Sequence, residues 1–141
     1  LLCLAERDRD APPLTGVATH FADTAERGMG ATLASGVARL GPVPFLLVAL
    51  GDMPWIAADS IRAVAAAARA DRIVVPTWRG QPGHPVAFGA DFLPLLAGLD
   101  GDQGARTVVT THRASVREIS LDDPGILRDV DRASDLRDAM P

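Results

Sequence analysis

Six apolar residues, Phe45–Leu50, run without a break and are followed at once by Gly51 and a single carboxylate, Asp52. An uninterrupted apolar run of this length predicts a strand that is buried on both faces, as in a parallel sheet covered by helices. Gly51 lets the backbone turn sharply after the strand, and Pro54 stiffens the exit. Because ligands of open α/β sheets bind beyond the carboxyl ends of the strands, Asp52 is predicted to lie on the floor of a site.

Predicted strands and helices alternate along the rest of the chain. Apolar spacing and turn residues predict strands near 1–5, 17–21, 45–50, 73–76, 86–88, 116–121 and 127–130, and helices near 28–40, 59–68, 91–99, 105–112 and 134–140. Asp59 is expected to cap the second of these helices. The alternation predicts an α/β fold with a mostly parallel sheet covered on both faces, in a single domain over residues 1–141.

Composition narrows the function classes. The net charge is −4, from 14 basic and 18 acidic residues, which argues against a nucleic-acid-binding surface. All 14 basic residues are arginine, so lysine is not available as a phosphate ligand. The single cysteine, Cys3, excludes an internal disulfide and a cysteine metal cluster, and it fits a reducing cytoplasm. No apolar run approaches the roughly 18 residues of a membrane span.

Carboxylates in two parts of the chain, one after the apolar run and one pair near the end of the chain, are candidate metal ligands. Asp52 alone after a buried strand suits a hard cation such as Mg²⁺, which takes one or two protein carboxylates and completes its shell with water and phosphates. Asp129 and Asp131 flank Val130, so a strand would point both acids to one side. The alternatives are that Asp52 merely ends a strand, and that the two acids form a solvated edge with a helix cap at Asp131 or Ser134.

Three other segments carry polar candidates with structural alternatives. A helix that begins at residues 28–32 can present backbone N–H groups to an anion, or be a plain helix entry. His84, between Gly83 and Pro85, can orient a ligand, donate to phosphate or transfer a proton, or it can bond only to its own loop. Arg106 can bind phosphate or pair locally with Asp102.

Five segments, taken together, resemble one known family. In chain order they are GMGATLASGV, LGDMP, GHPVAF, GDQGAR and DVDRASDL. The set resembles the MobA-like NTP transferases over about residues 17–140, and within them the molybdenum cofactor cytidylyltransferases. The resemblance implies a three-layer, Rossmann-like nucleotidyltransferase fold. It also implies transfer of CMP (or GMP) from CTP (or GTP) to molybdopterin, with Mg²⁺ as cofactor and pyrophosphate released.

The resemblance also assigns roles to residues. Asp52 would be the main Mg²⁺ ligand, and Asp131, ahead of Asp129, would complete the metal site. His84 and Arg106 would join Asp52 as catalytic residues, without a defined step for either. The nucleotide or acceptor pocket would be lined by Gly28, Met29, Gly30, Thr32, Leu33 and Gly51. The small-molecule partners would be an NTP and molybdopterin, and a molybdoenzyme or its chaperone is the candidate recipient of the product.

The sequence also departs from the family pattern. Met53 stands where the family has Gln, and residues 132–134, Arg-Ala-Ser, replace Thr-Pro-Glu. Residues 1–8 resemble the family's second strand, so the sheet is expected to lack the first strand and the LAAGxSxRMG loop that cradles the triphosphate. Two alternatives follow: a non-catalytic homologue acting as a binding or partner protein, and a sugar-nucleotide transferase on the same fold.

Overall fold

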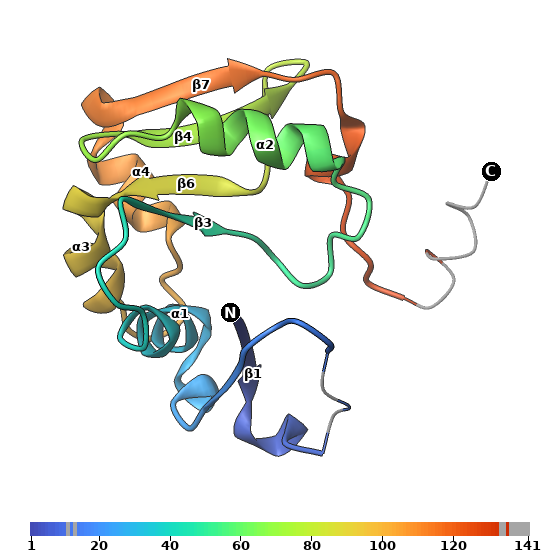
Figure 1. Ribbon diagram of the computed structural model, residues 1–141, viewed down its shortest axis with the longest axis vertical. Coiled ribbons are helices and arrows are strands. Elements are labelled where there is room, and N and C mark those ends of the chain that lie inside the picture. Colours follow the sequence, from blue (N-terminus) through green and yellow to red (C-terminus); the bar gives the residue numbers. More distant parts are fainter. Residues whose placement is uncertain (11, 13, 133–134, 136–141) are drawn as a thin grey trace. The chain divides into compact units, whose positions relative to one another are not determined.

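The computed structural model describes residues 1–10, 12, 14–132 and 135, which form two compact units (Figure 1). Unit 1 contains Leu1–Val43 and Phe92–Ala114, and unit 2 contains Pro44–Asp91 and the chain from Ser115 onward. Both units combine strands with helices, as the α/β prediction requires. Among the described residues, none of the helices combines the length and the apolar character that crossing a bilayer demands.

Unit 1 is a pair of parallel strands packed against helices. The strands β1 and β2 pair with Cys3 opposite His20, and helix α1 packs against both of them and against α3. The elements are β1 (Leu2–Ala5), η1 (Glu6–Asp8), β2 (Thr19–Ala22), η2 (Ala25–Arg27), α1 (Met29–Val37), α3 (Leu93–Ala97) and α4 (Arg106–Thr111). Two short 3₁₀ turns, η3 (Ala90–Phe92) and η4 (Arg113–Ser115), lie where the chain passes between the units.

Unit 2 is built on a mixed sheet in the order β3-β6-β4-β5, with β7 paired to β4 (Figure 1). Its elements are β3 (Phe45–Val48), α2 (Ala58–Ala67), β4 (Ile73–Trp78), β5 (Gln81–Pro82), β6 (Val86–Gly89), β7 (Val116–Ser120) and η5 (Pro124–Leu127). Strands β3, β4 and β7 share one direction, whereas β5 and β6 run against them. The reversal follows from the two-residue turn at 79–80, because parallel neighbours need a long crossover connection, and residues 83–85 lead from β5 to β6 in the same direction.

The core of unit 2 lies between the sheet and α2. Val64 and Ala68 pack with Val74 of β4 and Ala87 of β6, and partly buried residues that include Phe45 and Leu47 surround them. Leu47, Ala87 and Val74 are successive cross-strand neighbours, so one face of the sheet presents a continuous apolar row to α2. This packing fixes the ends of β3 and α2, between which the Asp52 segment runs.

Three expectations from the sequence are corrected here. Every residue of β3 is only half-buried, because β3 has a single strand partner, β6, among the described residues; burial on both faces is therefore wrong. The expected helix over 91–99 is instead the 3₁₀ turn η3 followed by the shorter helix α3. Asp59 does not cap α2, since its carboxylate pairs with Arg62 one turn further on.

Replacing Val64 by alanine tests the core of unit 2. Val64 is fully buried, so Val64→Ala should lower the free energy of unfolding by about 2 kcal/mol, at roughly 0.8 kcal/mol per lost methylene plus a cavity term. Ile61→Ala is the matched control, because Ile61 lies on the same helix but is 40% exposed. Urea unfolding of both variants measures the difference, and an equal loss would contradict the packing described.

Candidate functional site

Asp52 lies directly beyond the carboxyl end of β3, in the segment of residues 51–57 that leads to α2; we call this segment the Asp52 loop. The Asp52 side chain is exposed, and the next residue, Met53, is buried. Met53 therefore anchors the loop while the carboxylate stays in solvent. Met53, which stands where the family usually has Gln, therefore packs into the protein interior.

The chain near its end runs beside the Asp52 loop. The backbone N–H of Val130 donates a 2.8 Å hydrogen bond to the main-chain carbonyl of Asp52. Val130 is half-buried, whereas Asp129 and Asp131 on either side of it are exposed. This backbone hydrogen bond thus places Asp129 and Asp131, the two neighbours of Val130, close to Asp52.

The predicted strand over 127–130 is wrong, although the predicted alternation is present. Residues 124–127 form the 3₁₀ turn η5, and the chain from Arg128 to Asp131 has no regular structure. Pro124 and Gly125 favour a tight turn over an extended strand. Side-chain burial still alternates at 129–131 because the Val130 hydrogen bond to Asp52 substitutes for strand pairing. The predicted helix over 134–140 lies almost wholly outside the described residues.

His84 is attached to the same segment near the end of the chain that contacts the Asp52 loop. Its backbone N–H donates to the carbonyl of Ile126 at 2.9 Å, so the GHP turn is attached to η5. Burial disfavours the imidazolium and lowers the pKa of His84, and the negative charge of Asp52 only partly opposes this shift. The imidazole is therefore neutral at pH 7 and offers one N–H donor and one acceptor.

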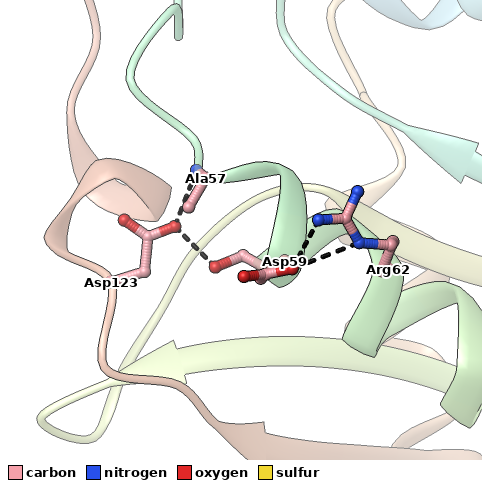
Figure 2. Close-up of polar contacts among 5 residues, drawn as sticks. Ala57, Asp59, Arg62 and Asp123 are labelled. Atoms are coloured by element: carbon pink, nitrogen blue, oxygen red, sulfur yellow. Dashed lines mark hydrogen bonds and ion pairs between the residues drawn. The ribbon is translucent and has the colours of Figure 1, made fainter.

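A buried carboxylate that the motifs do not include joins these segments. One oxygen of Asp123 accepts from the backbone N–H of Ala57 at 2.9 Å and from the Ser60 hydroxyl at 2.6 Å. The other oxygen accepts from the N–H of Gly125 at 2.8 Å. Figure 2 shows Asp123 facing Ala57 at the start of α2, where Asp59 pairs with Arg62 instead. The helix cap predicted from a local residue is thus supplied from 66 positions away.

The contacts between the two segments follow an antiparallel register. We call residues 123–131 the tail segment. From its start to its end, Asp123 binds Ala57 and Ser60, the Arg128 guanidinium stacks 4.5 Å from the centre of the Trp55 ring, and Val130 binds Asp52. The Asp52 loop is therefore held along its length by the tail segment.

The described residues contain no preformed metal cage. No group of three or more His, Cys, Asp or Glu side chains among them is arranged to hold an ion. The structure does bring the Asp52 loop, His84 and the segment carrying Asp129 and Asp131 together within unit 2. Gly51 opens the same loop and is exposed.

The remaining predicted residues lie in unit 1, where two motifs contact each other. Gly28 has φ of 116°, and a Cβ there would lie 2.5 Å from the carbonyl carbon of Gly101 and closer still to the Asp102 carboxylate. The N–H of Gly30 donates to the carbonyl of Gly101 at 2.8 Å. Arg27 pairs with Asp100 at 2.6 Å, which lowers the pKa of Asp100. The start of α1 is thus clamped to the GDQG turn, which explains why glycine stands at position 28.

The other unit 1 candidates flank this clamp. Met29 is 60% exposed, the Thr32 hydroxyl donates to the carbonyl of Gly28 at 3.1 Å, and Leu33 is half-buried. Arg106 is exposed at the start of α4. The ion pair between Asp102 and Arg106 that their spacing allows is not among those formed by the described residues.

Comparison with known proteins identifies the family. The sequence model of the MobA-like NTP transferase domain matches residues 2–116. This chain belongs to the MobA-like NTP transferase family. The match includes segments of both units, and it confirms the family predicted from the five motifs.

Relatives of this MobA-like chain include a curated protein and several solved structures. The purine catabolism protein PucB of Bacillus subtilis (strain 168) is 28% identical over 115 residues, which are 79% of this chain and 56% of PucB. The chain thus spans little more than half the length of that relative.

Solved structures extend the comparison to the fold. Rv0371c from Mycobacterium tuberculosis H37Rv is 31% identical, with a TM-score of 0.80 over 97% of this chain and 73% of its own. Rv0371c has also been solved in complex with manganese. A nucleotidyl transferase from Methanothermobacter, 23% identical with a TM-score of 0.69 over 86% of this chain and 61% of its own, shares the fold. The predicted α/β nucleotidyltransferase fold class is therefore confirmed.

The clamp between α1 and the GDQG turn predicts a strong effect of one methyl group. Gly28→Ala should lower the free energy of unfolding by more than about 1 kcal/mol, because alanine is strained at positive φ and its Cβ meets the GDQG turn. Gly41→Ala is the control, since a Cβ at Gly41 meets nothing within 4 Å. Thermal unfolding of both variants checks this, and equal stabilities would refute the clamp.

Asp123 predicts a pH dependence of stability. Burial favours the neutral acid, but the hydrogen bonds from Ser60, Ala57 and Gly125 outweigh it, so the pKa of Asp123 lies below its ordinary value. The carboxylate therefore stabilises the fold above about pH 4, the pKa of an unfolded Asp, and this contribution is lost as pH falls through the lower folded pKa.

Asp123→Asn should accordingly cost about 1–3 kcal/mol at pH 7, because a buried donor loses its acceptor. The gap between wild type and variant should stay constant from pH 7 to pH 5 and narrow as the pH falls below about 4 and through the lowered pKa of Asp123. Urea unfolding across this range measures it. A gap that does not change with pH would mean that the Asp123 charge contributes nothing.

Proposed function

We propose that this protein is a divalent-metal-dependent nucleotidyltransferase that moves CMP from CTP to molybdopterin and releases pyrophosphate. The single observation that supports this best is the hydrogen bond from Val130 to Asp52, because it places the backbone that carries the exposed Asp129 and Asp131 beside Asp52, beyond the carboxyl end of β3. Membership of the MobA-like family supports the reaction class. The resemblance of LGDMP, GHPVAF and GDQGAR to the cytidylyltransferase branch supports CTP over GTP.

The donor set fits a hard divalent cation. The candidates are the carboxylates of Asp52, Asp131 and Asp129, and oxygen donors are what Mg²⁺ and Mn²⁺ prefer. One or two carboxylates without a protein cage are typical of Mg²⁺ sites that phosphate oxygens and water complete. The manganese complex of Rv0371c supports a divalent ion in this family. When bound, such an ion would supply Lewis acidity to the phosphates and neutralise the departing pyrophosphate.

The reaction needs positioning more than a protein nucleophile. A phosphate oxygen of the acceptor forms a bond to the α-phosphorus of the nucleotide, and the bond from that phosphorus to the pyrophosphate oxygen breaks. Charge and atoms balance without a covalent enzyme intermediate, so alignment and electrostatic stabilisation provide the catalysis. The chain has no lysine, and the candidate site residues include exposed acids and the exposed Arg106, whose charges suit these tasks.

His84 and Arg106 receive separate roles in this proposal. His84 is neutral, and its pKa responds to the charge of Asp52, so the two side chains act on the same site. The imidazole would donate its N–H to a phosphate oxygen and orient that phosphate. Arg106, exposed at the start of α4, would bind phosphate through its guanidinium fork. Gly28–Leu33 would line the nucleotide or acceptor pocket at the clamped start of α1, as the family likeness implies.

Asp52→Asn tests the proposal in the full-length protein. Pyrophosphate release from CTP, molybdopterin and Mg²⁺ should fall at least about 100-fold, because several kcal/mol of charge stabilisation are lost. Asp91→Asn is the control, since Asp91 is also exposed but lies at the far end of the sheet from β3's carboxyl end. Turnover that requires GTP would correct the nucleotide. Turnover only with a sugar phosphate, or no nucleotide binding by the folded wild type, would refute the proposal.

A further inference from the structure

Asp123 is the most deeply buried carboxylate among the described residues of unit 2, at 8% exposure, and no family motif includes it. Its hydrogen-bond partners are Ala57, Ser60 and Gly125, none of which is a candidate metal ligand. All three are donors, so they fill three of the roughly four acceptor sites of the carboxylate, and burial leaves little access for a cation or substrate. A buried charge with three donors is held rigidly, because each unmade bond would leave a buried polar group unsatisfied.

The position of Asp123 in the chain links it to the candidate site. It stands at the start of the tail segment, which then contacts His84 through Ile126 and Asp52 through Val130. Gly125 packs directly against the backbone of the Asp52 loop, because a Cβ at this position would overlap the carbonyl oxygen of Trp55. A shift of the tail segment would therefore move the His84 contact and the acids beside Val130 together.

We propose that Asp123 is a positioning residue, whose carboxylate fixes the register between the Asp52 loop and the tail segment and thereby places His84, Asp129 and Asp131 relative to Asp52. The inference deepens the proposed function, on which its metal-binding consequence rests. The register itself is a property of unit 2 and can be measured without metal or nucleotide.

Asparagine at position 123 is the sharpest probe of this role. Asp123→Asn keeps the size of the side chain but turns one acceptor oxygen into an NH₂ donor. If the NH₂ group replaces Oδ2, it faces the donors of Ala57 and Ser60; if it replaces Oδ1, it faces the N–H of Gly125. Asp59→Asn is the matched control, because Asp59 lies one residue before Ser60 but pairs with Arg62 in solvent (Figure 2). Ser60→Ala is a milder second variant that removes one of the three bonds and keeps the charge.

Amide hydrogen exchange in the full-length protein reads the register directly. The N–H groups of His84 and Val130 should exchange about tenfold faster in Asp123→Asn than in Asp59→Asn, as expected when a hydrogen bond that opposes local opening is lost. The N–H of Gly89, bonded to Arg72 elsewhere in unit 2, should not change. Ser60→Ala should show the same pattern with a smaller increase, and it replaces Asp123→Asn if that variant does not fold.

The metal readout separates this inference from the proposed function. Mn²⁺ titrated by electron paramagnetic resonance in the presence of CTP should bind about 10- to 100-fold more weakly to Asp123→Asn than to Asp59→Asn. Unchanged exchange at His84 and Val130 in folded Asp123→Asn and Ser60→Ala would overturn the positioning role. Faster exchange at those two amides, with no Mn²⁺ binding by the wild type, would uphold the register and refute the proposed function alone.

Discussion

The pairing of the Asp52 loop with the tail segment is the constraint on which the candidate site depends. A loop that leaves a strand with a glycine and an exposed acid has little reason to keep one conformation. Here the buried Asp123 carboxylate, the stacking of Arg128 on Trp55 and the Val130 hydrogen bond fix it at successive points. The two segments lie about 70 residues apart in sequence, so tertiary contacts alone give the loop its shape.

This arrangement suits chemistry that relies on alignment. Nucleotidyl transfer between two bound substrates gains most from fixed charges and fixed donors, and it needs no nucleophile from the protein. Under the proposed function, the exposed acids beyond the end of β3 would bind the cation, and the neutral imidazole of His84 would donate to a phosphate. In unit 1, the glycine-mediated contact between α1 and the GDQG turn gives a second rigid surface of backbone groups.

Local patterns predicted the features that local residues determine. The apolar run Phe45–Leu50 located β3, and the following Asp52 was correctly placed beyond its carboxyl end. The strand over 127–130 was wrong because Pro124 and Gly125 commit the chain to a turn, a signal that the apolar residues after them obscured. Asp123 was missed because its partners, Ala57 and Ser60, are distant in sequence; the Asp-Pro-Gly pattern predicts its bond to Gly125 but neither of the others. The roles of the site residues remain predictions.

Paramagnetic broadening by Mn²⁺–CTP tests the central claim most directly, because it locates the ion on the folded chain. In backbone amide spectra of the full-length protein, the signals of Asp52, His84 and Val130 should broaden first, and excess Mg²⁺–CTP should restore them. If these signals stayed sharp while those around Asp100 and Asp102 broadened, the carboxylates joined by the tail segment would not be the metal–nucleotide site.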